Sequence, residues 1–180
     1  MTNIDHQTRV LALDIRPRSS GFAVFEGSRN LLYWGVKDLR SGVNAAKLPA
    51  ASKLLALIDE FAPSVIAIKK STNERSTIRR NIIATIQRQA KERKIPVILI
   101  SSEEIRRTFT GSKSNKFGVA SALAQRFDVL VWRLPPKRKC WQTEDYRMSI
   151  FDAVAVGIAY FGRFSSSGRQ RNSLRFQRRT

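Results

Sequence analysis

The order of apolar runs along the first 100 residues constrains the fold of this chain more than any other feature. Three short runs, at 10–15, 21–25 and 31–36, lie at the spacing of hairpin-connected strands and predict an antiparallel meander. Two more apolar runs, at 64–68 and 95–100, each follow a segment of helical periodicity. This order predicts an α/β fold with a mixed five-stranded sheet, in which the meander is followed by two parallel strands and helices cover both faces.

Helical periodicity accounts for most of the remaining chain. Apolar residues recur every three or four positions in the segments 46–61, 76–93, 116–127 and 144–161, and each segment is expected to form a helix. Between the last two lies the basic segment RLPPKRKCWQT, at 133–143, where two consecutive prolines stop any helix. The chain shows no internal repeat.

Composition divides the chain into one domain and two ends. Residues 1–8 are polar and are expected to form a flexible leader, while 9–164 are expected to fold as one domain with a sizeable core. From Arg163 onward the chain has six arginines and no acidic residue, with Ser, Gly and Gln between them. Such a segment buries too little apolar surface to order itself, so 165–180 is expected to be a disordered basic tail.

The charge of the chain points to a polyanionic partner. Lys and Arg number 33 against 14 Asp and Glu, a formal net charge of +19, and an excess of this size most often serves nucleic-acid binding. No membrane partner is expected, because no predicted helix sets a broad apolar face against a lysine face. The single His6 and single Cys140 exclude a zinc finger and an internal disulfide. A lone cysteine and no signal-peptide pattern favour a cytoplasmic location.

LALDIRPRSSGFAVFE and FAPSVIAIKK, two motifs in the first half of the chain, resemble those of RuvC-type Holliday-junction resolvases, which belong to the RNase H-like superfamily. LALDIRPRSSGFAVFE is similar to that family's first hairpin, where an aspartate ends the first strand and a Ser/Thr-Gly-aromatic step opens the second. Here these residues are Asp14, Ser20, Gly21 and Phe22. FAPSVIAIKK is similar to the fourth strand of the family, which ends on a catalytic glutamate.

Two further motifs extend the resemblance over most of 9–162. GSKSNKFGVASALAQRF resembles the family's lysine-bearing helix, with Lys116 at the basic position. SIFDAVAVGIAY resembles the last helix, which carries the final catalytic aspartate, here Asp152. The resemblance implies an RNase H-like fold, a branched-DNA partner and a Mg²⁺- or Mn²⁺-dependent nuclease site.

The chain departs from the family at two of its four acidic positions. Asp14 and Asp152 match and are the expected metal ligands if any metal is bound, but Lys69 stands where the glutamate is expected. Ser149, one helical turn before Asp152, stands where the third acid is expected, and Arg16 replaces a small residue. An ammonium between two aspartates forms a stable pair without a metal. We therefore expect Asp14, Lys69 and Asp152 to form a salt-bridged remnant of a metal site.

Other acidic residues could supply ligands in place of the missing ones. Asp145 is seven residues before Asp152 and would share its helix face, while Glu74, Glu103 and Glu104 follow predicted strands. Each is also open to a simpler interpretation, as an exposed acid or as favourable charge at a helix N-terminus.

The sequence leaves three functions open. The leading hypothesis is a RuvC-like protein of recombination or repair that binds branched DNA and has lost most or all cleavage activity. The alternatives are an active metal-dependent junction endonuclease, a hydrolase with an altered ligand set, and a structural subunit that binds RNA or a ribonucleoprotein. Candidate nucleic-acid-binding residues are Arg16, Arg18, Arg75, Arg79, Arg80, Arg106, Arg107, Lys113, Lys116, Lys137, Arg138, Lys139 and Trp141.

The resemblance also implies a homodimer, because RuvC-type proteins pair through the long helix after the fourth strand. In that segment the isoleucines Ile78, Ile82, Ile83 and Ile86 form a stripe. The same stripe would equally serve as ordinary core against the sheet.

Overall fold

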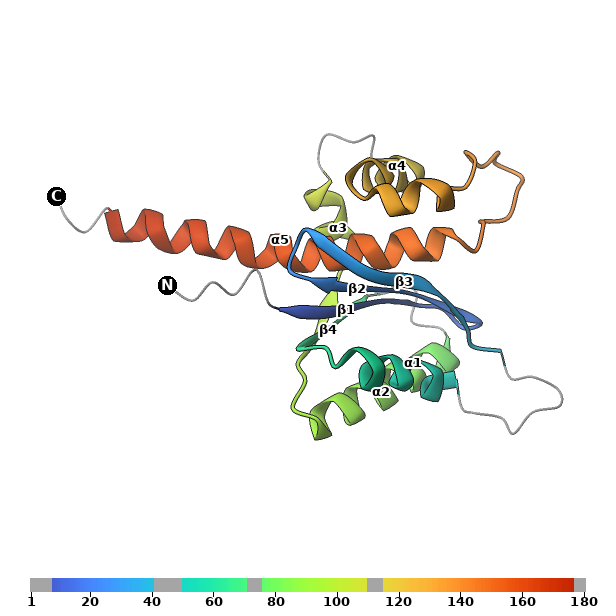
Figure 1. The fold of residues 1–180 in the computed structure, drawn as a ribbon, viewed down its shortest axis with the longest axis horizontal. Helices are drawn as coiled ribbons and strands as arrows, with labels where there is room; N and C mark the ends of the chain where they lie inside the picture. The colour runs from blue at the N-terminus through green and yellow to red at the C-terminus, as the bar shows by residue number, and fades with distance from the viewer. Residues whose placement is uncertain (1–7, 41–49, 71–75, 110–114, 177–180) are drawn as a thin grey trace.

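The structure, a computed structural model, describes residues 8–40, 50–70, 76–109 and 115–176, and side chains as far as residue 163. The predicted leader lies almost wholly outside these residues. One mixed sheet forms the centre of the molecule, and Figure 1 shows helices above and below it. Among the described residues no helix combines the length and apolar character needed to cross a membrane.

The sheet has the topology that the sequence predicts. Strands β1 (Arg9–Ile15), β2 (Ser19–Glu26) and β3 (Asn30–Asp38) form the antiparallel meander, with Gly27 in a left-handed conformation in the turn after β2. Strands β4 (Val65–Lys69) and β5 (Val97–Ile100) pair in parallel, in the order β3-β2-β1-β4-β5. The mixed five-stranded α/β sheet is therefore confirmed.

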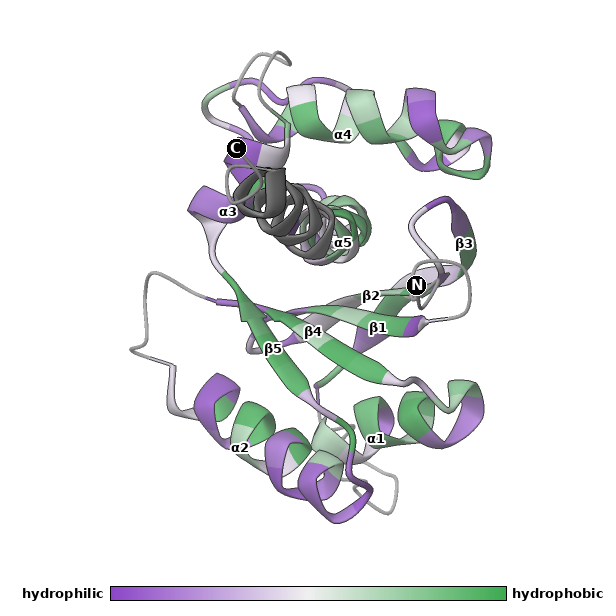
Figure 2. Cartoon of the chain, turned by 90° about the vertical axis from the view of Figure 1, so that its left-hand side faces the viewer, coloured by the Kyte–Doolittle hydropathy of each residue, from purple (hydrophilic) through white to green (hydrophobic). Residues whose placement is uncertain are grey.

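Helices cover both faces of the sheet, as Figure 2 shows. Helices α1 (Ala50–Phe61) and α2 (Thr77–Glu92) pack on one face. On the other, α5 (Met148–Phe176) lies against the strands, with α3 (Ser102–Thr108) and α4 (Lys116–Arg126) beside it. The residues of β1 alternate between these two cores: Val10 and Ala12 face α5, whereas Leu11 and Leu13 face α1 and α2.

Several features differ from the sequence-based expectation. Helix α3 and the 3₁₀-helix η1 (Asp128–Arg133) were not predicted, although Ser101 and Glu104 form a capping box that starts α3. Helix α5 begins at Met148 rather than at residue 144, and its backbone continues as helix to Phe176. The continuation passes through the segment expected to be a disordered tail.

Candidate functional site

Strand alternation places Asp14 and Lys69 side by side. Leu13 of β1 pairs with Ile68 of β4 in parallel register, so the next residues along the two strands are Asp14 and Lys69. Both fall on the side of the sheet that faces α5, because side chains alternate along each strand. The two strands therefore deliver opposite charges to the same point at their carboxyl ends.

Helix α5 brings Asp152 to this point because Gly21 lets it approach the sheet closely. Gly21 pairs with Asp14 across β1 and β2. A Cβ built on Gly21 would lie only 1.8 Å from the carbonyl oxygen of Ser149. Ser149 is buried, and its hydroxyl donates to the carbonyl of Tyr146 at 2.7 Å. This packing fixes the start of α5 on the sheet, and Asp152 follows one turn later.

Two cations each bridge the carboxylates of Asp14 and Asp152. Arg16 donates from Nε to Asp14 Oδ2 at 2.8 Å and from Nη2 to Asp152 Oδ2 at 2.7 Å. Lys69 Nζ lies 2.8 Å from Asp152 Oδ1 and 3.7 Å from Asp14 Oδ1. The salt bridge expected of Asp14, Lys69 and Asp152 is present, and Arg16 joins it from the opposite oxygens.

The cluster extends to a third acid and a third cation. Glu144, in the segment before α5, accepts from Arg16 Nη1 at 3.1 Å and from Lys116 Nζ at 2.8 Å, and Lys116 lies 3.4 Å from Asp152 Oδ2. Side-chain exposure is 8% at Asp14, 16% at Lys69 and 54% at Lys116. We call these six residues the charge cluster: Asp14, Arg16, Lys69, Lys116, Glu144 and Asp152. With three acids and three cations its formal charge is zero.

Burial and opposite charge compete in setting the pKa values of the cluster. Burial raises the pKa of Asp152, but the charges of Lys69, Lys116 and Arg16 outweigh it, and the pKa falls below its ordinary value. Burial lowers the pKa of Lys116 and of Arg16, yet the carboxylates around them raise both pKa values overall. All three groups are therefore held in their charged forms.

Arg79 of α2 supports the cluster from behind. Its Nε donates to the carbonyl oxygen of Ile15 at 2.8 Å, and its Nη2 donates to that of Lys69 at 2.6 Å. It thereby links the ends of β1 and β4 just beyond Leu13 and Ile68, the last residues that pair directly between the two strands. Arg79 was expected to contact nucleic acid, but its guanidinium here holds together the two strands that carry Asp14 and Lys69.

The alternative ligands do not join the cluster. Asp145 precedes the first turn of α5, so the expectation that it shares the helix face of Asp152 is wrong; it accepts from Arg147 instead. Glu103 pairs with Arg107, and Glu104 caps the N-terminus of α3. Glu74 lies outside the described residues.

Sequence reasoning missed Glu144 and the bridging geometry of Arg16. No periodic signal could mark Glu144, because it lies in an irregular segment. Ser149 does occupy the turn before Asp152, but its hydroxyl is committed to the Tyr146 carbonyl rather than to the cluster.

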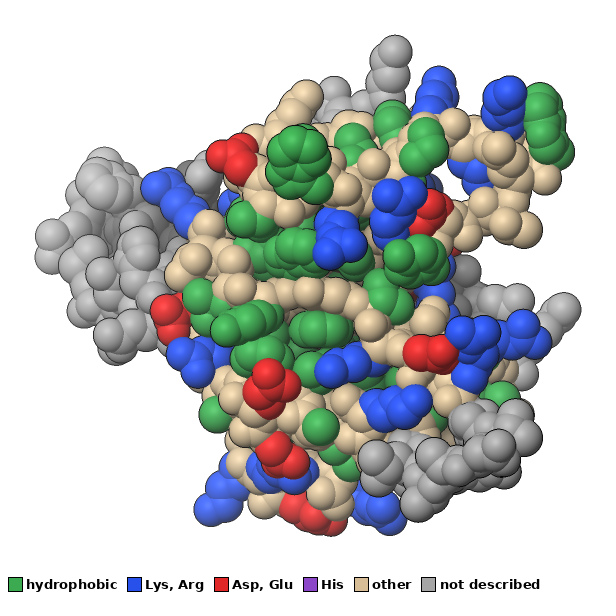
Figure 3. Space-filling view, turned by 45° about the vertical axis from the view of Figure 1, so that its right-hand side comes forward, with side chains coloured by type: hydrophobic (Ala, Val, Ile, Leu, Met, Phe, Trp, Pro, Cys, Tyr) green, Lys and Arg blue, Asp and Glu red, His purple; other side chains and the backbone are tan. Residues whose placement is uncertain are grey.

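The remaining nucleic-acid-binding candidates are distributed over the surface. Arg18, Arg80, Arg106 and Arg107 are exposed, as are Lys137, Arg138, Lys139 and Trp141 of the loop before α5. Arg75 and Lys113 lie outside the described residues. Figure 3 shows Lys and Arg side chains scattered widely over one face, with fewer acidic side chains interspersed among them.

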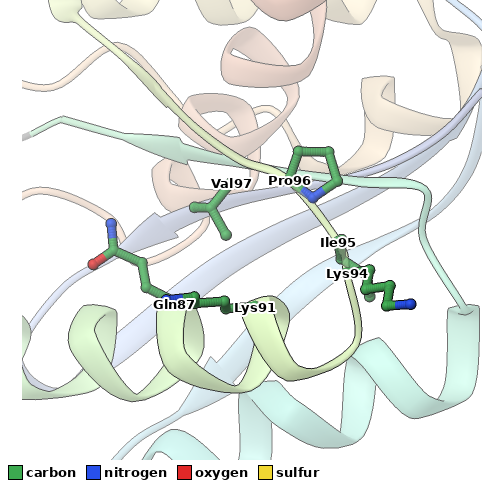
Figure 4. Close-up of a pocket in the computed structure, with 6 residues that line it drawn as sticks. All are labelled: Gln87, Lys91, Lys94, Ile95, Pro96 and Val97. Atoms are coloured by element: carbon green, nitrogen blue, oxygen red, sulfur yellow. The ribbon is translucent and has the colours of Figure 1, made fainter.

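An open pocket of about 400 Å³ lies away from the charge cluster. Figure 4 shows it between the C-terminal end of α2 and the start of β5. Its lining is Gln87, Lys91, Lys94, Ile95, Pro96 and Val97. None of these residues belongs to the charge cluster.

The donors of the charge cluster do not fit a divalent metal ion. Mg²⁺ requires several free oxygen ligands around it. Here Arg16 and Lys69 hold both oxygens of Asp152 and both of Asp14. Over the ranges that the structure describes, no group of three His, Cys, Asp or Glu residues is arranged to hold a metal.

The sheet order β3-β2-β1-β4-β5, with helices on both faces, matches the RNase H-like fold of RuvC-type proteins. The chain is similar to Thermus thermophilus RuvC in complex with Holliday junction substrate, with a TM-score of 0.57 and 15% identity over 88% of this chain and 96% of that one. It is also similar to the yeast mitochondrial Holliday junction resolvase Ydc2, with a TM-score of 0.55 and 16% identity over 95% of this chain and 86% of that one.

A viral protein has the same fold. The fowlpox virus Holliday junction resolvase matches with a TM-score of 0.57 and 14% identity, over 87% of this chain and 99% of its own. No protein-family model matches the chain, and no curated protein does. The likeness therefore lies in the fold rather than in the sequence.

Proposed function

We propose that this chain binds branched DNA of the four-way-junction type and no longer cleaves it, or cleaves it only weakly. The observation that carries the proposal is the pair of cations that bridges Asp14 and Asp152 within a resolvase fold. Two-metal phosphodiester cleavage needs free carboxylate oxygens to hold two ions about 4 Å apart. Arg16 and Lys69 neutralise those oxygens. The ammonium of Lys69 also occupies the position where a third carboxylate ligand would be expected.

DNA affinity must come from cations outside the charge cluster. The six residues of the cluster sum to zero charge, so Arg16 and Lys116 contribute little net attraction to phosphate. The chain nevertheless carries a formal charge of +19, and exposed cations such as Arg18, Arg80 and Arg106 are available. Such contacts give affinity and position on the backbone rather than sequence recognition.

The test is a paired binding and nicking assay on a synthetic four-way junction. We expect the protein to bind the junction in EDTA more tightly than a linear duplex of the same sequence. We also expect little or no nicking of the junction with Mg²⁺ or Mn²⁺. Metal-dependent nicking that Asp14→Asn abolishes would instead establish the active endonuclease. Tighter binding to structured RNA than to the junction would favour the RNA-binding subunit.

We also propose that the chain acts as a homodimer through α2. Ile82 and Ile86 are buried against the sheet and α1, so they belong to the core rather than to an interface. Ile78 is 57% exposed and Ile83 is half-buried, so these two members of the stripe are available to a partner. Sedimentation at tens of micromolar tests this: a dimer that Ile78→Glu dissociates is expected, and a monomer at all concentrations contradicts it.

A further inference from the structure

The loop between η1 and α5 carries an exposed tryptophan among cations. Trp141 is 75% exposed, and the Lys139 ammonium lies 5.4 Å from the centre of its ring. Lys137 and Arg138 precede this pair, and the segment 133–143 contains no acidic residue. Trp141 is therefore a large exposed aromatic side chain in a segment whose charged residues are all cations.

Hydrogen bonds hold this part of the loop in a defined turn. The Gln142 backbone N–H donates to the Lys139 carbonyl at 3.1 Å, and the Lys139 backbone N–H donates to Gln142 Oε1 at 3.0 Å. Trp141 lies inside the turn that these bonds close. The indole and the ammonium are thus positioned together before any ligand binds, which lowers the entropy cost of binding.

The same loop is attached to the charge cluster. Glu144 accepts from Arg16 and Lys116, and it follows Trp141 by three residues. Three residues of chain span at most about 11 Å. Figure 1 shows the loop, in orange, projecting at the end of the molecule where α5 begins, and Figure 3 shows cationic side chains beside an exposed hydrophobic one at the projecting upper edge.

We infer that Trp141 stacks on an unpaired or unstacked DNA base while Lys137, Arg138 and Lys139 contact the flanking phosphates. An indole presents a flat apolar face that stacks on any base, and a nearby cation neutralises the adjoining phosphate. Bases inside a continuous duplex are already stacked, whereas those at a branch point can open. This inference rests on the proposed function, and it makes this loop the part of the protein that recognises the DNA branch point.

The experiment compares full-length variants on three DNAs: a four-way junction, a linear duplex and a single strand. Trp141→Ala is expected to weaken junction and single-strand binding about tenfold, while duplex binding changes less than twofold. Trp141→Phe should keep most of the affinity. Trp132→Ala removes another exposed tryptophan, 88% exposed, and should change neither. With 2-aminopurine at the branch point, the wild type should quench its fluorescence and Trp141→Ala should not.

Two results would overturn the inference. The first is an equal reduction in junction and duplex affinity in Trp141→Ala, which would make the residue a general contact; the second is no reduction at all. If the wild type does not favour the junction over duplex, the proposed function fails, but stacking is still tested on the single strand. There, an unchanged affinity in Trp141→Ala would reject stacking, and a tenfold weaker affinity would support it.

Discussion

Lys69 Nζ lies 2.8 Å from Asp152 Oδ1, so the residue that replaces the expected glutamate forms a salt bridge with the aspartate that the family motif retains. Both side chains are largely buried, at 16% and 13% exposure. A charge pair in this environment interacts strongly, and removal of one partner leaves the other poorly solvated.

Loss of the Lys69 ammonium should therefore destabilise the protein. We expect Lys69→Met, which keeps the aliphatic stem, to lower the free energy of unfolding by about 1–3 kcal/mol, since Asp152 keeps Arg16 and Lys116 as partners. Urea denaturation measures the change. A double-mutant cycle with Asp152→Asn should give a coupling energy of similar size, and a coupling near zero would show that the pair contributes only packing.

Removal of the two bridging cations should create a metal site. Unit charges 4 Å apart interact by roughly 4 kcal/mol at an effective dielectric of 20, so a dication is repelled by each cation by roughly 8 kcal/mol. A millimolar site supplies only about 4 kcal/mol. The wild type should bind no Mg²⁺ at millimolar concentration, whereas the double variant Arg16→Ser, Lys69→Glu should bind it.

Titration calorimetry with Mg²⁺ and Mn²⁺ checks this expectation. Lys69→Glu alone is the matched control: because Arg16 still bridges the two aspartates, it should bind more weakly than the double variant. Ser149→Asp is a poorer choice than the family motif suggests, since its side chain would be buried beside the Tyr146 carbonyl. Millimolar metal binding by the wild type would contradict the prediction.

Protonation of Asp152 should lower the free energy of unfolding at acidic pH. Its pKa is lower in the folded protein than its ordinary value of 3.8, so its ionisation stabilises the fold above about pH 4 and this contribution is lost as the pH falls through the folded pKa. The stability difference between wild type and Asp152→Asn should shrink as the pH falls below the ordinary pKa of 3.8 and through the lower folded pKa. Lys116 acts at alkaline pH. Its pKa is raised in the folded protein, so its charge stabilises the fold below its unfolded pKa, and this stabilisation is lost as the pH rises through the folded pKa.

Urea midpoints at several pH values test both the effect of Asp152 at acidic pH and that of Lys116 at alkaline pH. Asp59→Asn, at a carboxylate that is 63% exposed, controls for the removal of a surface acid. A difference between wild type and Asp152→Asn that stays constant down to pH 2 would show that the Asp152 carboxylate does not stabilise the fold by its charge.

Any residue larger than glycine at position 21 should destabilise the protein. Its missing Cβ would lie 1.8 Å from the Ser149 carbonyl oxygen, so Gly21→Ala must displace either β2 or the start of α5. We expect the free energy of unfolding to fall by about 1–3 kcal/mol. Gly162→Ala is the matched control, because its nearest contacts are at 3.7 Å and helix propensity favours alanine there. Equal stability of the two variants would contradict the close approach.

The basic C-terminal segment should add affinity without adding selectivity. Removal of residues 165–180 deletes five arginines and should flatten the dependence of log K on log salt, by up to about 0.9 for each phosphate that the shortened chain no longer neutralises. Fluorescence anisotropy on junction and duplex at several salt concentrations measures both slopes. A truncation that abolishes junction preference but keeps duplex binding would show that the segment reads structure.

The sequence predicted the parts of the cluster that lie on regular elements. Strand alternation and motif order were enough for Asp14, Lys69 and Asp152, because period and register determine where such residues point. Glu144 follows no period, and the side chain of Arg16 could have turned toward solvent or toward Asp14. The expected position of Asp145 was wrong because helix α5 starts four residues later than its apolar pattern suggests, so Asp145 lies in the irregular segment before the helix.

The side chains of the charge cluster differ in solvent exposure, so the cluster has an outer, exposed side and an inner, buried side. Lys116 at the start of α4 is 54% exposed, whereas Asp14 at the end of β1 is 8% exposed. Added salt screens exposed pairs much more than buried ones. Rising ionic strength should therefore release the first turn of α4 while β1 and β4 stay joined. Amide hydrogen exchange would then quicken in that turn at salt concentrations that leave the two strands protected.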